Sequence, residues 1–189
     1  MKLAIVYYSY SGNNESLAKE LRLRFGSDLV KIEEQKKRTS FTILLDLAFG
    51  RDAKVRKPKV FLRDYETLIF IAPVWDFKIA TPMKSFIKME REHIRNYAFI
   101  TVCGGREGQK QKITEQLQYM VGKKPIGVTE LEIKSILHPD LKDDAKWVAS
   151  YKIKDHDFSA FKKPIRDFVN TVFSYSKEHT ERIPLMKVN

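Results

Sequence analysis

Residues 3–25 have the sequence LAIVYYSYSGNNESLAKELRLRF, and this stretch decides the fold class. Leu3 to Tyr8 is almost wholly apolar, which is typical of a strand buried on both faces of a sheet. A helical pattern follows at once, because apolar residues from Leu17 to Phe25 recur on one face while charged residues fall largely on the other. The stretch therefore predicts a buried strand that leads directly into a helix.

The same alternation of apolar runs with helical periodicity continues along the chain. Four further strands are expected, at Asp28–Glu33, Thr67–Pro73, Tyr97–Cys103 and Val128–Leu137. Helices are expected near 79–92 and 107–122, together with a last helix that carries Pro164 in its first turn. Strands joined by helical crossovers form a parallel sheet covered by helices on both faces. We therefore predict an α/β fold with a doubly wound, five-stranded parallel sheet.

Length and composition indicate a single domain. The chain has 189 residues, of which 43% are hydrophobic, enough to bury one core. We expect residues 1–179 to form that domain and residues 180–189 to form a loose C-terminal tail. No apolar run is long enough for export or for crossing a bilayer, so we expect a soluble, cytoplasmic protein without a transmembrane segment.

Cysteine and histidine usage restricts the chemistry. Cys103 is the only cysteine, which excludes an internal disulfide and any paired-cysteine redox or metal site. The four histidines lie far apart without ligand-like spacing, so we expect no metal site. Redox chemistry in this protein would therefore depend on a bound cofactor.

The charge is strongly basic, with a formal net charge of +11. Such a surface attracts anions, which include nucleic acids, acidic proteins, anionic membranes and phosphorylated ligands. The sequence contains no RNA-binding signature, zinc finger or continuous basic helix. We therefore expect no specific nucleic-acid binding.

Ligands of doubly wound sheets bind beyond the carboxyl ends of the strands, which directs attention to three loops. The first follows the first strand and consists of Ser9, Tyr10, Ser11, Gly12, Asn13 and Asn14. Unpaired backbone N–H groups and the helix dipole favour an anion at a helix start, and Gly12 allows close approach. The loop is chemically suited to a phosphomonoester, although the same residue types also form ordinary turns and helix caps.

The second and third loops are suited to a flat aromatic ligand. The second follows the third strand and contains Pro73, Val74, Trp75, Asp76 and Phe77. Its two aromatic rings would either stack on a ligand or fill the junction between helix and sheet. The third loop continues from Cys103 through Gly104, Gly105 and Arg106 to Gly108. Its glycines let backbone pass close to a ring, and Arg106 either stabilises charge there or is a surface residue.

The first loop resembles the phosphate loop of flavodoxins, which is written Thr/Ser-x-Thr/Ser-Gly-Asn-Thr. The loops at 73–78 and 103–108 also match the two flavin-flanking loops of that family in order and position, and the resemblance covers roughly residues 1–137. It implies a flavodoxin-like sheet of strand order 2-1-3-4-5 and a non-covalently bound flavin mononucleotide (FMN). The phosphate would lie at Ser9 to Asn14, and Trp75 and the Gly104–Gly105 backbone would lie beside the ring.

The chain differs from the flavodoxin pattern in two respects. Asn14 replaces the usual hydroxyl residue and is followed by Glu15, whose charge would oppose a phosphate if the side chain pointed inward. The chain is also basic, whereas typical flavodoxins are acidic and dock basic partners. These differences keep open a reduced affinity for FMN and a role other than that of a classical flavodoxin.

The resemblance favours an FMN-dependent electron-transfer protein, either a carrier or a small oxidoreductase of the quinone reductase type. Its partners would be a redox protein or a small-molecule acceptor such as a quinone, with a nicotinamide as a possible donor. Two alternatives remain: an interaction domain with a weakened FMN site, and a basic binder of anionic surfaces. None of the residues is expected to act as a nucleophile or an acid, because the cofactor does the chemistry.

Two further segments are candidates for what distinguishes this chain. Residues 40–50 would form a short helix that is apolar nearly all round and must be buried, over the sheet edge, in a homodimer contact or as a lid on the flavin. The connection at 138–157 is long for a compact domain and carries Trp147 and Tyr151. It would form either a flap on the substrate side or an ordinary surface excursion.

Overall fold

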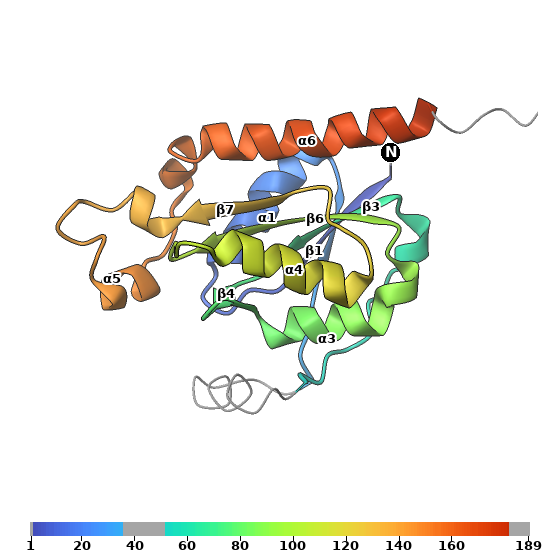
Figure 1. Cartoon of the computed structure of the whole chain (residues 1–189), viewed down its shortest axis with the longest axis horizontal. Coiled ribbons are helices and arrows are strands. Elements are labelled where there is room, and N and C mark those ends of the chain that lie inside the picture. The colour runs from blue at the N-terminus through green and yellow to red at the C-terminus, as the bar shows by residue number, and fades with distance from the viewer. Residues whose placement is uncertain (1, 36–51, 182–189) are drawn as a thin grey trace, which may run out of the picture.

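The computed structural model describes residues 2–35 and 52–181 (Figure 1). The strands are β1 (Leu3–Tyr7), β2 (Asp28–Lys31), β3 (Thr67–Ile71), β4 (Val74–Trp75), β5 (Lys78–Ile79), β6 (Asn96–Cys103) and β7 (Val128–Glu132). The α-helices are α1 (Asn13–Phe25), α3 (Thr81–Glu90), α4 (Gln109–Val121), α5 (Ala145–Ser150) and α6 (Lys162–Glu181). Short 3₁₀ turns are η1 (Leu62–Asp64), η2 (Arg91–His93), η3 (Ile133–Ser135) and η4 (Asp155–Ser159).

Five strands form one parallel sheet in the order β2-β1-β3-β6-β7. Because β4 and β5 form a separate two-stranded hairpin, β6 and β7 are the fourth and fifth strands of this sheet, and the order is the predicted 2-1-3-4-5. The strand order reverses beside β1, where β2 lies on one side and β3 on the other. The carboxyl end of β1 therefore opens at the switch point, the place where such sheets bind ligands.

The core lies in two layers, one on each face of the sheet. Along β1, Leu3, Ile5 and Tyr7 pack on one face with α1 and α6, as the alternation of side chains in a strand requires. Residues Ala4 and Val6 face the opposite layer, which α3 and α4 cover. Figure 1 shows α6 on one side of the sheet and α3 and α4 on the other. The doubly wound α/β prediction is confirmed.

Several strands end earlier than the sequence predicts. Strand β7 ends at Glu132 instead of Leu137, and residues Ile133–Ser135 form a 3₁₀ turn. Its neighbour in the described sheet, β6, ends at Cys103 directly opposite Glu132, so the pairing among the described strands stops at that point. Strand β3 likewise ends at Ile71, where its pairing with β1 stops.

Two sequence predictions fall on parts of the chain that are not described. The apolar segment 40–50 lies outside the described residues, and so do residues 182–189 of the predicted tail. The last helix begins at Lys162, which places Pro164 in its first turn as expected, and it continues to Glu181.

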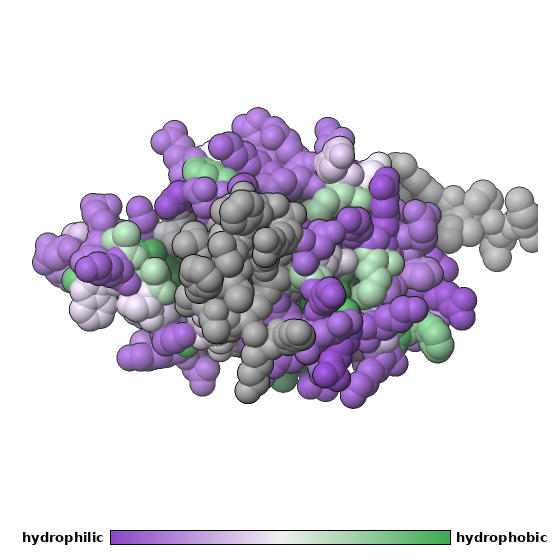
Figure 2. Space-filling model, turned by 90° about the horizontal axis from the view of Figure 1, so that it is seen from below, coloured by the Kyte–Doolittle hydropathy of each residue, from purple (hydrophilic) through white to green (hydrophobic). Residues whose placement is uncertain are grey.

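The described surface in Figure 2 is predominantly hydrophilic, with hydrophobic residues in small separate areas. Exposed large apolar side chains include Leu23, Phe61 and Tyr119, which come from different elements. Within residues 2–35 and 52–181, none of the helices is both long enough and apolar enough to cross a membrane.

Candidate functional site

A cavity of about 400 Å³ opens at the carboxyl ends of β1, β3 and β6. Predicted residues that line it are Ser11, Asn13, Asn14, Pro73, Val74, Trp75, Asp76, Cys103, Gly104, Gly105 and Arg106. Residues that the sequence analysis did not single out also line it, namely Val102, Gln109, Ile133, Lys134, Asp143, Ala145, Val148 and Ala149. Ser9, Tyr10, Gly12 and Phe77 are not part of this lining. The fold thus brings the three predicted loops to one cavity.

The first loop presents the bare end of a helix. Gly12 is the N-cap of α1 and has a φ of 98°, and no side chain caps the helix there. The loop closes on itself, because the Gly12 N–H donates to the Ser9 Oγ at 3.1 Å. The first intrahelical bond runs from the Ser16 N–H to the Gly12 carbonyl. The N–H groups of the first turn are therefore left to solvent or to an anion.

The two asparagine side chains bind protein, on different sides of α1. The Asn14 carboxamide is buried and pairs with both backbone groups of Val102, accepting from its N–H at 3.0 Å and donating to its carbonyl at 3.2 Å. The Asn13 carboxamide donates to the Tyr151 carbonyl at 2.8 Å and accepts from the Ile153 N–H at 3.1 Å. The carboxamide oxygen of each residue and one N–H of each amide are therefore already engaged by the protein.

Glu15 is engaged by lysines. Its carboxylate lies 3.0 Å from Lys19 and 3.3 Å from Lys31. Its hydrogen bond to Lys19 is the main reason that the pKa of this carboxyl is lowered from its ordinary value. Because these ammonium groups compensate the charge, Glu15 opposes an anion at the loop less than an unpaired carboxylate would.

The second loop is a tight hairpin between β4 and β5. Its central residues, Asp76 and Phe77, have φ values of 45° and 61°, the signs of a type I′ turn, although neither is glycine. Trp75 lines the cavity, and the Tyr10 ring meets it edge-on at 6.1 Å between centroids. Phe77 instead lies against α4, with the Lys112 ammonium 4.3 Å from its ring centroid. Of the aromatic residues predicted at the site, Tyr10, Trp75 and Phe77, only Trp75 lines the cavity.

In the third loop, the backbone at Gly104 and Gly105 lies close to neighbouring side chains. Gly105 has a φ of 83°, and a Cβ there would lie 2.8 Å from the Glu132 Oε2. A Cβ on Gly104 would lie 3.1 Å from the Val148 Cγ1. The Arg106 guanidinium forms an exposed ion pair of 3.1 Å with Asp76, which joins the second and third loops. Part of the arginine charge is therefore already compensated within the protein.

Cys103 lies buried at the floor of the cavity. Burial is the largest reason that the pKa of its thiol is raised to about 12, and the nearby Glu130 carboxylate adds to the effect. The thiol lies 3.7 Å from the Glu130 Oε1, which also accepts a hydrogen bond from Gln109. A neutral thiol is a poor nucleophile.

The connection at 138–157 lies over the site. It contains α5 and leads into η4, and Figure 1 shows it beyond the carboxyl end of β7. Val148 packs against Gly104, and Asn13 holds the backbone at Tyr151 and Ile153. The sequence signals for this placement are the length of the connection and its two aromatic residues, Trp147 and Tyr151. Trp147 is half exposed and is not among the cavity residues.

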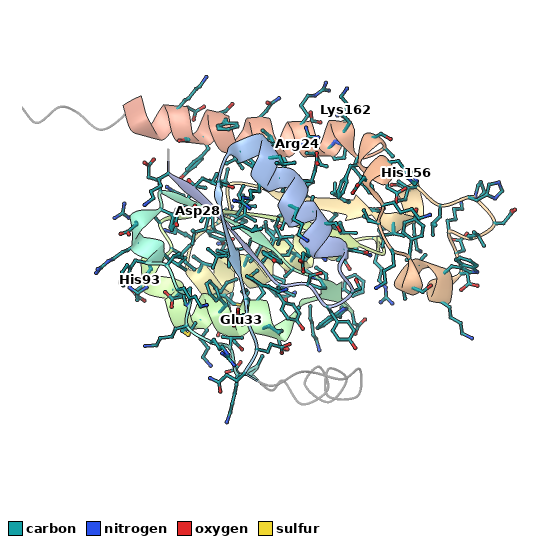
Figure 3. The ribbon with its side chains drawn as sticks, turned by 180° about the vertical axis from the view of Figure 1, so that it is seen from behind. Arg24, Asp28, Glu33, His93, His156 and Lys162 are labelled. Carbon is teal, nitrogen blue, oxygen red and sulfur yellow. The ribbon has the colours of Figure 1, made fainter. Side chains whose placement is uncertain are left out.

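The described residues contain no group of three or more His, Cys, Asp or Glu side chains that could hold a metal ion. His93 and His156 are labelled in Figure 3 and lie at opposite ends of the molecule. Each instead contacts a neighbouring carboxylate, Glu90 and Asp157 respectively.

Comparison with known proteins identifies the architecture. No family profile and no curated protein matches the sequence. Among solved structures, a Lactobacillus acidophilus flavoprotein in complex with FMN matches with a TM-score of 0.60 at 20% identity, over 68% of this chain and 92% of that one. The chain has the flavodoxin-like fold.

Two further structures support this flavodoxin-like assignment. The apo form of the L. acidophilus flavoprotein matches with a TM-score of 0.57 at 18% identity, over 70% of this chain and 93% of that one. A candidate flavoprotein from Bacteroides uniformis matches with a TM-score of 0.60 at 15% identity, over 78% of this chain and 97% of that one. Most of the length of each flavoprotein is therefore represented in this chain.

Proposed function

We propose that this flavodoxin-like chain binds FMN non-covalently at the carboxyl ends of its strands and transfers electrons through it. The observation that carries the proposal is the uncapped N-terminus of α1, which opens beside a cavity walled by Trp75 and by the Gly104–Gly105 backbone. A helix start suits the phosphate, and an aromatic side chain in the cavity wall suits the flat ring. A volume of about 400 Å³ lies within the usual range for cofactor sites, which is roughly 300–1,000 Å³.

Different residues would bind the phosphate and the ring of FMN. Backbone N–H groups of the Ser11–Asn14 stretch would hold the phosphate, while Trp75 would stack on the ring. The backbone of the third loop at Gly104 and Gly105, which lines the cavity, would lie beside the ring. The flavin when bound supplies the electron-transfer chemistry, and the protein orients it and limits the access of water and oxygen.

The interaction-domain alternative depended on Asn14 and Glu15. Asn14 pairs with the backbone of Val102, and Glu15 pairs with Lys19 and Lys31. The Asn14 side chain is neutral and the Glu15 charge is paired, so neither places an unpaired negative charge at the helix end. This favours a loop that binds phosphate over one that has lost this ability.

A fluorescence titration tests FMN binding, because the chain has only two tryptophans, Trp75 and Trp147. We expect added FMN to quench Trp75 strongly, so that the Trp147→Phe variant keeps most of the quenching. The Trp75→Phe variant should lose most of it and bind FMN more weakly. A wild-type protein that is colourless when purified and whose fluorescence does not respond to added FMN would contradict the proposal.

The donor and acceptor are the second half of the proposal. A carrier would exchange electrons with a redox protein, whereas a reductase would consume NADH or NADPH steadily when a quinone is present. Steady consumption by the FMN-loaded protein would assign it to the reductases. Reduction that stops after one equivalent of flavin would assign it to the carriers.

A further inference from the structure

The Lys152 side chain contacts the first loop, although Lys152 and Ser11 are 141 positions apart in the sequence. Its Nζ donates a hydrogen bond of 2.5 Å to the carbonyl oxygen of Ser11. Ser11 directly precedes Gly12, the N-cap of α1, so the lysine ammonium lies beside the first turn of a 13-residue helix. The flavodoxin pattern described above contains no lysine in the loop itself, and this cation comes from the 138–157 connection.

The backbone on both sides of Lys152 is fixed. The Asn13 carboxamide bonds the Tyr151 carbonyl and the Ile153 N–H, so it brackets the lysine with two hydrogen bonds. Ile153 is buried in the core layer of α1 and α6, and the Tyr151 hydroxyl donates to Asp157 at 3.0 Å. Since side chains alternate along extended backbone, anchoring Ile153 in the core directs Lys152 to the opposite side.

The lysine ammonium lies at the end of the helix that normally attracts anions. The N-terminus of a helix carries partial positive charge, and cations are normally stabilised at the other end. Within residues 2–35 and 52–181, no carboxylate lies within 4.0 Å of the Lys152 ammonium to compensate it. The partial positive charge of the helix end and the lysine ammonium repel each other. With a phosphate bound at the loop, both would instead attract the same anion.

We propose that Lys152 is a ligand of the FMN phosphate and that Asn13 is the positioning residue that holds it there. The inference rests on the proposed FMN site and adds to it a cation that selects for the phosphate. The flexible stem of the lysine lets its ammonium exchange the Ser11 carbonyl for a phosphate oxygen. The residue therefore discriminates FMN from riboflavin, which has the same ring and no phosphate.

Dissociation constants of FMN and riboflavin, measured by flavin fluorescence, test this inference. In Lys152→Gln we expect about a ten- to hundredfold loss of affinity for FMN, the range for a hydrogen bond to a charged group. Riboflavin affinity should stay unchanged. Lys152→Arg should retain much of the preference for FMN, and raised salt should weaken FMN binding to wild type more than to Lys152→Gln.

Two further variants separate this role from general effects. Lys146→Gln removes the same charge from α5, in the same connection, and should leave both affinities unchanged. Asn13→Ala should reproduce the selective loss of FMN affinity, because it frees the backbone beside the lysine. An equal loss of FMN and riboflavin affinity in Lys152→Gln would overturn the inference, as would no loss. Failure of wild type to bind FMN would overturn the proposed function itself and this inference with it.

Discussion

Replacing Asn14 by alanine should destabilise the protein far more than a typical polar substitution. The change leaves the N–H and the carbonyl of Val102 without their carboxamide partner, and both bonds are buried. The Val102 carbonyl still accepts a hydrogen bond of 3.2 Å from the Thr101 hydroxyl, so the N–H is the group left unpaired. An unpaired buried polar group costs about 1–3 kcal/mol, which is the loss expected here.

Urea unfolding of the protein without added flavin measures this loss. With a slope of about 2 kcal/mol per molar urea, the midpoint should fall by about 0.5–1.5 M. Asn96→Ala is the matched control, because the Asn96 carboxamide also makes two bonds, to Glu66 and Tyr175, of which the Glu66 bond is solvent-exposed. That variant should lose less than about 1 kcal/mol. Equal losses in the two variants would refute the view that Asn14 joins α1 to β6.

Three other changes test further parts of the site. Gly105→Ala should destabilise the fold by about 1–2 kcal/mol in urea unfolding, because the new Cβ meets Glu132 at a φ of 83°; unchanged stability would contradict this. Cys103, with a pKa of about 12, should resist iodoacetamide at pH 8 in the folded protein and react on unfolding, as mass spectrometry would detect; rapid native alkylation would contradict its burial. Glu15→Gln should cost less than about 1 kcal/mol at pH 7 and nothing at strongly acidic pH, where both forms are neutral. Because folding lowers the pKa of Glu15, its contribution is complete above the unfolded pKa and disappears as pH falls through the folded value, so an equal cost at all pH values would be inconsistent.

The sequence predicts the location of the site well because each buried strand of a parallel sheet can be identified from its own run of residues. An apolar run such as Leu3–Tyr8 identifies a buried strand, and the carboxyl ends of such strands meet at one edge of the sheet. Three loops that each follow a strand therefore converge, without knowledge of any long-range contact. Trp75 and Gly104 are found at the cavity for this reason.

The direction of individual side chains could not be predicted in the same way. Asn13 and Asn14 are neighbours with identical chemistry, yet one binds backbone 138 and 140 residues away and the other binds backbone 88 residues away. Phe77 is, like Trp75, an aromatic residue of the second loop, but in the turn its ring lies against α4. Lys152 was missed because nothing in its local sequence relates it to Ser11, from which it is separated by 141 positions.

The asparagine pair also determines when the first loop can become complete during synthesis. A chain leaves the ribosome from its N-terminus, so residues 9–14 emerge early, together with β1 and α1. The partner of Asn14 on β6 is made much later, and the partners of Asn13 follow only near residue 153. Nascent chains shorter than this can pair β1 with β2 and β3 while the loop still lacks its supports. The proposed binding of an anion at this loop would therefore belong to the last stage of folding, when its binding energy adds to a nearly complete fold.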